Sequence, residues 1–157
     1  GEQQAEQIVR GWVANLATDV FSNDTALMEA IAAGQCDVGI VNTYYFGRLI
    51  ADKPDLPLAL FWANQETSGV HINISGIGLT AHAPNRDEAI RLMEWMSTEL
   101  PQQVLAEQNL EYPVNPAVSP TGLVTGWGEF RGDDLNVSVA GARQVQAVKL
   151  MDRAGYR

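Results

Sequence analysis

The sequence is poor in the residues that most often build disulfides, redox centres and metal sites. Its 157 residues include one cysteine, Cys36, and two histidines, His71 and His82. A single cysteine excludes an internal disulfide and any site with several cysteine ligands, and the residues around Cys36 predict a buried thiol. No combination of nucleophile, base and orienting group is visible, so the sequence indicates a protein that is not an enzyme.

Positive charge and long apolar runs are also scarce. Ten Lys and Arg residues against nineteen Asp and Glu residues give a formal charge of −9, which disfavours binding to nucleic acid and to anionic lipid. No apolar stretch approaches the roughly 20 residues of a membrane span. The N-terminal "GEQQAEQIVRG" has no cationic segment followed by an apolar one, so we expect any signal peptide to be absent from this sequence.

What the sequence does contain is a globular composition, with 46% hydrophobic residues, arranged as alternating helix and strand patterns. Apolar spacing, capping residues and first-position prolines predict helices. The first is expected over 3–16. The second is expected to begin at Asn23 or Asp24 and to end before Gly34, and the third to start near Thr43. Further helices are expected after a capping box formed by Asn85 and Glu88, from Pro101 onward, and over about 141–154.

Two segments have the pattern of strands. The run "CDVGIV" (36–41) is short and apolar, and Val70, Ile72 and Ile74 alternate with polar residues, as in a strand with one covered face. Between these segments, residues 54–70 are rich in turn-forming residues and predict a boundary or crossover. The sequence therefore predicts an α/β fold in two parts.

Two adjacent tyrosines, Tyr44 and Tyr45, stand at the junction between the first of these strands and the helix that follows it. At about 100° per residue, Phe46, Leu49 and Ile50 share one face of that helix, while Tyr44 lies nearly opposite and Tyr45 to the side. The hydrophobic core therefore does not bury both tyrosine rings. The first turn of a helix also favours negative charge, so a phenolate is tolerated better here than elsewhere.

Adjacent phenolates suit one class of ligand in particular. A free tyrosine has a pKa of about 10, so ionisation at neutral pH needs a strong local cation, and a bound metal ion supplies one. Ferric iron prefers anionic oxygen donors, whereas zinc and copper favour nitrogen or sulfur. From the spacing alone a second interpretation stays open, in which Tyr44 and Tyr45 are ordinary amphipathic surface residues.

Three stretches of the sequence carry a family resemblance. They are "AIAAGQCDVGIVNTYYFGRL", "GVHINISGIGLTAHAPNRDEAIRLMEWMSTELPQQVLAEQNLEYPVNP" and "LNVSVAGARQVQAVKLMDRAGYR". Together they resemble the carboxy-terminal half of periplasmic ferric-iron-binding proteins, the substrate-binding components of iron ABC transporters. The Asn-Thr-Tyr-Tyr block, the Asn-Ile-Ser-Gly strand and the Glu-Tyr-Pro-Val-Asn-Pro segment occur in the order found in that family.

The resemblance implies a portion of a two-lobe, type II periplasmic-binding-protein fold, with a ligand cleft between the lobes. Tyr44 and Tyr45 would be iron ligands through their phenolate oxygens. Asn42 and Asn23 would lie behind these ligands, and the equivalents in some members help to hold a companion anion. The ligand implied is Fe(III), with an anion such as carbonate or phosphate.

The resemblance also implies an organisation and a set of partners. Residues 1–68 would belong to the second lobe, 69–75 to a hinge crossover, and 76–157 to the first lobe and C-terminal helix. The missing amino-terminal half, or a domain-swapped copy, would complete the fold, and an inner-membrane ABC permease would receive the iron. The expected location is the periplasm, or the cell surface of a Gram-positive bacterium through a lipid anchor.

Two other functions remain as alternatives at this stage. One is a periplasmic binding protein for another small ligand or oxyanion, in which the tyrosines serve as hydrogen-bonding or stacking groups. The other is an α/β enzyme, for which no catalytic set is apparent. Several polar residues that could suggest a site are predicted to be structural or solvated instead: His71, His82, Tyr112, Asp133 and Asp134.

Overall fold

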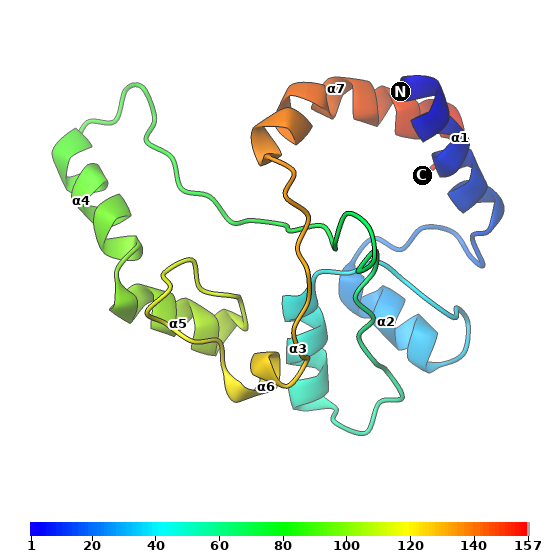
Figure 1. The fold of residues 1–157 in the computed structure, drawn as a ribbon, viewed down its shortest axis with the longest axis horizontal. Helices are drawn as coiled ribbons and strands as arrows, with labels where there is room; N and C mark the ends of the chain where they lie inside the picture. Colours follow the sequence, from blue (N-terminus) through cyan, green and yellow to red (C-terminus); the bar gives the residue numbers. More distant parts are fainter. Residues whose placement is uncertain (157) are drawn as a thin grey trace. The chain divides into compact units, whose positions relative to one another are not determined.

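The computed structural model describes residues 1–156, and these contain seven helices (Figure 1). They are α1 (Glu2–Ala14), α2 (Asp24–Ala32), α3 (Thr43–Asp52), α4 (Arg86–Met96), α5 (Glu99–Asn109), α6 (Gly122–Thr125) and α7 (Val137–Ala154). None of the helices in this described part is both long and apolar enough to cross a membrane.

The chain divides into two compact units. Gly1–Ile40 and the C-terminal segment from Asp133 form unit 1, which holds α1, α2 and α7. Val41–Gly132 forms unit 2, which holds the helices from α3 to α6. These units group residues by packing, and the lobe and hinge boundaries expected at 68, 69–75 and 76 stay a prediction.

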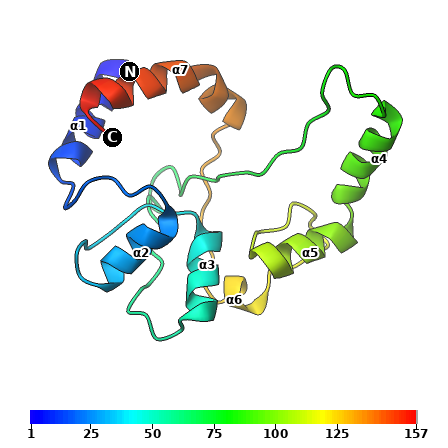
Figure 2. The ribbon, with the colours of Figure 1, turned by 180° about the vertical axis from the view of Figure 1, so that it is seen from behind.

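In unit 1, α1 and α7 lie side by side, as Figures 1 and 2 both show. Val9 from α1 is buried against Leu150 and Ala154 from α7, with Met151 and Tyr156 packed around them. Of the apolar residues whose spacing predicts the first helix, Val9 faces this core, whereas Ile8 and Trp12 are about half exposed, and the helix ends at Ala14 rather than at 16.

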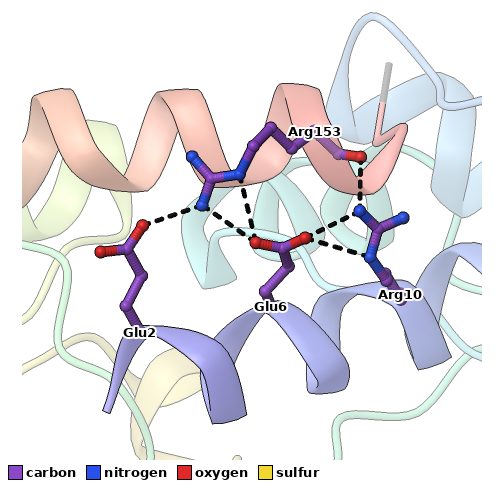
Figure 3. A network of polar contacts seen from close by, with 4 residues as sticks. All are labelled: Glu2, Glu6, Arg10 and Arg153. Carbon is purple, nitrogen blue, oxygen red and sulfur yellow. Dashed lines mark hydrogen bonds and ion pairs between the residues drawn. The ribbon is translucent and has the colours of Figure 1, made fainter.

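Four charged residues join the same two helices along one side (Figure 3). Arg153 of α7 bridges two carboxylates of α1, with 2.8 Å from its Nη2 to Glu2 Oε1 and 2.9 Å to Glu6 Oε2. Arg10 reaches Glu6 Oε1 at 2.7 Å and donates to the backbone carbonyl of Arg153 at 2.9 Å. Glu6 is thus held between two guanidinium groups.

The second helix of unit 1 begins and ends as expected. The side-chain oxygen of Asn23 accepts a hydrogen bond from the backbone N–H of Ala26 at 2.8 Å and so caps α2. The chain leaves the helix through Gly34, whose φ of +75° is the conformation that glycine adopts most readily. Beyond it, Gly39 passes so close to α2 that an added Cβ would lie 2.8 Å from Leu27 Cδ2.

The predicted strands are not formed within the described residues. The segments 36–41 and 70–80 have no strand neighbour there, and a single parallel bridge joins Val70 to Gly132. A strand requires a hydrogen-bonded partner along its length, which the described residues do not provide. The apolar side chains of Val38 and Ile40 are accordingly 84% and 87% exposed. The buried thiol expected at Cys36 is also wrong, because this residue is only half-buried.

In unit 2, α3 buries the face that its sequence predicts. Phe46, Gly47 and Leu49 are buried, and the Phe46 ring meets the Trp127 indole edge-to-face, with 5.9 Å between centroids. The absence of a side chain at Gly47 allows Leu110 and Trp127 to approach the helix closely. One face of α3 is therefore fixed, and the other is left for Tyr44 and Tyr45.

One helix cap and one helix start differ from the sequence predictions. Asn85 precedes α4 but its side chain makes no cap hydrogen bond, so the capping box expected with Glu88 is not formed. Helix α5 begins at Glu99 after Thr98, which places Pro101 at the third helical position rather than the first. Proline is still accommodated there, because backbone N–H groups in the first turn have no partner within the helix.

The last helix is longer than expected. It starts at Val137 rather than near residue 141, because the side chain of Asn136 accepts from the N–H of Ser138 at 2.9 Å and caps it there. It ends as predicted at Gly155, with a φ of +80°.

A set of contacts that we call the clamp ties residues 65–70 to 131–132 within unit 2. Gln65 donates to the carbonyl of Arg131 at 3.1 Å and accepts from its N–H at 2.6 Å. The N–H of Val70 donates to the same carbonyl at 2.9 Å. Gly69, at φ +91°, lies against the backbone of Gly132. The clamp fixes where the extended segment 70–80 begins.

Candidate metal centre

The two tyrosines lie in the first turn of α3, where the sequence places them. Tyr44 and Tyr45 are both half-buried, and their ring centroids are 4.3 Å apart with the ring planes tilted by 41°. Asn42 is the residue that precedes the helix. Because Phe46 anchors the next position in the core, the start of the helix and the two rings are held in one orientation.

A cation lies beside both rings. The guanidinium carbon of Arg48 is 5.4 Å from the centroid of Tyr44 and 5.9 Å from that of Tyr45, which is within the range of a cation–π interaction. Arg48 follows these residues by four and three positions, so helical spacing brings it to the same side of α3. Its Nη2 also reaches Asn109 Oδ1 on α5, at 3.3 Å.

Asn42 is tied to a distant part of unit 2. Its side chain makes no cap hydrogen bond to α3. Instead, its Oδ1 accepts a hydrogen bond from Asn73 Nδ2 at 2.8 Å. Asn73 stands in the extended segment that leaves the clamp, and it therefore contacts the residue two positions before the tyrosine pair.

The second asparagine proposed from the family pattern has another local role. Asn23 lies in unit 1, and its side-chain oxygen caps α2. A part for Asn23 in holding an anion stays a prediction.

The other candidate residues lie on other segments of the chain. His71 and His82 are exposed. The ring of Tyr112 packs edge-on against Phe130 and lies 6.4 Å from Trp127 between centroids, and burial raises the pKa of Tyr112. Within residues 1–156, no three or more His, Cys, Asp or Glu side chains gather in a way that could hold a metal ion. The donors that α3 offers are phenol oxygens, which as phenolates are hard ligands suited to a hard cation.

The sequence predicts the tyrosines as site residues and the family resemblance adds Asn42, but neither points to two residues that contact them, Arg48 and Asn73. Arg48 could have been found, because positions i+3 and i+4 from a tyrosine pair share its face of a helix. Asn73 could not, since it is 31 positions from Asn42 and no local pattern joins them.

Comparison with known proteins gives a consistent result, although no protein-family model matches the chain. Iron uptake protein A2 of Synechocystis is 39% identical over 165 residues, which is all of this chain and 48% of the relative. Iron uptake protein A1 of the same organism is 36% identical over 163 residues, again all of this chain and 45% of the relative. The chain thus spans about half the length of the curated relatives it matches.

Solved structures agree over the same extent. A Trichodesmium protein (IdiA, FutA) in complex with iron and citrate has a TM-score of 0.93 and 39% identity, covering 100% of this chain and 52% of the other. A ferric binding protein from Campylobacter jejuni also has a TM-score of 0.93, with 32% identity over 99% of this chain and 51% of the other. These matches confirm the predicted fold, a portion of the two-lobe type II periplasmic-binding-protein architecture.

Proposed function

We propose that this chain is about half of a ferric-iron-binding protein, as its similarity to the iron uptake proteins indicates, and that Tyr44 and Tyr45 bind Fe(III) through their phenolate oxygens. The observation that carries the proposal is the arrangement of the two rings, which are 4.3 Å apart in the first turn of α3. Partial positive charge at this end of the helix favours anionic oxygen. Each phenol releases its proton as the metal binds.

Charge balance supports a companion anion. Two phenolates offset two of the three positive charges of Fe(III), and another anionic ligand would offset the remaining positive charge. The guanidinium of Arg48 lies beside both rings and is a second cation that an anion could contact. Carbonate, phosphate or a carboxylate ligand would meet both requirements, and the Trichodesmium relative was solved with iron and citrate.

The remaining ligands and the cover for the apolar segments would come from beyond these residues. Val38, Ile40, Ile74 and Ile77 lie on the extended segments and are exposed. Strands from the amino-terminal half, or from a swapped copy, would pair with these segments and shield them from water. The complete protein would hold iron between two lobes in the periplasm, or at the cell surface, and deliver it to an ABC permease.

The proposal is tested by titrating the chain with ferric nitrilotriacetate and recording its visible spectrum. We expect a tyrosinate-to-iron charge-transfer band that weakens in Tyr44→Phe and in Tyr45→Phe and disappears in the double variant. Phenylalanine keeps the ring and removes the ligand oxygen, so circular dichroism should stay unchanged. Tyr156→Phe is the matched control, because Tyr156 packs against the core of α1 and α7.

Two results would contradict the proposal. The first is equal ferric affinity of the wild-type and doubly substituted chains in competition with citrate. The second is a colourless protein that binds phosphate tightly, which would support the alternative of an oxyanion-binding protein. The relatives do not favour that alternative, since they are named for iron uptake and ferric iron binding. They are likewise named as binding and uptake proteins rather than enzymes.

A further inference from the structure

The residue that precedes α3 is held from outside the helix by a side-chain contact across 31 positions of sequence. Asn73 Nδ2 donates to Asn42 Oδ1 at 2.8 Å, and Asn42 is the residue from which α3 begins. An asparagine in this position usually caps its own helix with its side-chain oxygen. In α3 the side chain makes no such cap, and its oxygen accepts from Asn73 instead.

Asn73 follows the clamp by only three residues, counted from Val70. Val70 donates to the carbonyl of Arg131, and Gly69 leaves no room for a side chain, since a Cβ there would lie 2.6 Å from the carbonyl oxygen of Gly132. Gln65 holds Arg131 from both its N–H and its C=O. The extended segment therefore leaves the clamp in a defined direction and meets Asn42 at its fourth residue.

We infer that Asn73 is a positioning residue for iron binding, which sets the orientation of the Tyr44 and Tyr45 phenol groups through its hydrogen bond to Asn42. The inference rests on the proposed function of the tyrosine pair and assigns to it a residue that contacts neither ring. A metal ion needs its donor atoms in a narrow geometry, so residues behind the ligands affect affinity when they orient them. Asn73 links the clamp to that geometry.

The chemistry of the contact makes the inference specific. Only the amide nitrogen of Asn73 can donate here, and the oxygen of Asn42 accepts. Asn73→Ala removes the donor and leaves space, whereas Asn73→Leu removes the donor and keeps a side chain of similar size. If the role is positioning, both should behave alike, because the hydrogen bond is lost in each.

The test is a ferric nitrilotriacetate titration of the full 157-residue chain, followed by the charge-transfer band. We expect Asn73→Ala and Asn73→Leu to lower ferric affinity roughly two- to ten-fold, the range of one net hydrogen bond, and to shift the energy of the band. Ser75→Ala, two residues further along the same exposed segment, is the control and should bind as the wild type does. Circular dichroism should be the same for all four proteins, because Asn73 is exposed.

A double-mutant cycle separates a direct link from two independent effects. If Asn73 acts through Asn42, the double variant Asn42→Ala with Asn73→Ala should bind iron no more weakly than Asn42→Ala alone. Additive losses, or an unchanged affinity and band in both Asn73 variants, would overturn the inference. The proposed function is judged separately, by the effect of Tyr45→Phe in the same titration.

Discussion

Leu110 occupies the space in which Gly47 has no side chain. A Cβ built on Gly47 would come within 2.8 Å of Leu110 Cδ1 and 3.1 Å of the Trp127 ring. Leu110 ends α5 at a φ of +59°, a conformation that few residues other than glycine adopt. The close approach of α3, Leu110 and Trp127 thus fixes the helix that carries the tyrosines.

Gly47→Ala is expected to destabilise unit 2 although alanine is the better helix former. The gain in helix propensity is about 1 kcal/mol, while overpacking costs about 1–3 kcal/mol, and the rigid indole ring of Trp127 also packs against Phe46. Chemical denaturation followed by tryptophan fluorescence measures the change. Gly11→Ala is the control: it lies in α1, where an added Cβ meets no atom within 4 Å, so it should stabilise by up to about 1 kcal/mol. Equal effects of the two substitutions would show that the contact with Leu110 and Trp127 is not tight.

Gly69→Ala is expected to open the clamp. At a φ of +91° a side chain is strained, and the new Cβ would also strike the carbonyl oxygens of Gly132 and Arg131 at 2.6 and 2.7 Å. Gly128→Ala separates these two effects, because Gly128 has a φ of +82° with open space around it and should lose only the roughly 1–2 kcal/mol of left-handed strain. The Gly69 variant should lose more stability than the Gly128 variant. Hydrogen exchange at the N–H of Val70 should become faster in the Gly69 variant and stay unchanged in the Gly128 variant.

The pairing of α1 with α7 is expected to weaken in acid. Hydrogen bonds from Arg10 and then from Arg153 lower the pKa of Glu6 from its ordinary value of 4.5. A carboxylate with a lowered pKa contributes stability that is fully present above the unfolded value and is lost as the pH falls through the folded one. Glu6→Gln should therefore lower the thermal midpoint at neutral pH and make little difference well below pH 4.5. The difference in thermal midpoint between wild type and variant, measured from neutral pH to well below pH 4.5, tests this expectation. A difference that grows on acidification would contradict it.

Arg48→Met should loosen the tyrosine pair while keeping the aliphatic part of the side chain. The variant loses the cation beside both rings and the hydrogen bond to Asn109. An exposed cation–π contact contributes about 0.5–1 kcal/mol, so the free energy of unfolding should fall by a similar amount. Near-ultraviolet circular dichroism, which reports on ordered tyrosine rings, should lose intensity. Asn109→Ala removes only the link to α5 and should leave most of that signal intact.

Helices could be predicted from the sequence because their signals are local. The apolar spacing around Val9 and Phe46, the cap at Asn23 and the stops at Gly34 and Gly155 all agree with the structure. Two local signals mislead. Pro101 predicts a helix start two residues after the real one, and Asn85 predicts a side-chain cap that α4 forms without.

Strands and distant contacts could not be predicted in the same way. The alternation around Ile72 and Ile74 describes a side-chain pattern, but a strand exists only where another segment supplies hydrogen bonds, and residues 1–156 supply one bridge, at Val70. The tyrosine pair was found from its place at a helix start. Its contact through Asn42 to Asn73 joins residues whose proximity depends on the whole of unit 2, so no pattern near either one indicates it.

The ion pairs between α1 and α7 also bear on the order in which the chain folds. Arg153 and Glu6 are 147 positions apart, so their contact closes a loop that includes most of these 157 residues. Closing such a loop costs only slightly more free energy than closing one half as long, but distant contacts form slowly because nearby ones assemble first. The pairing of α1 with the eighteen-residue α7 should therefore be a late event in folding, after the contacts between neighbours in sequence have formed.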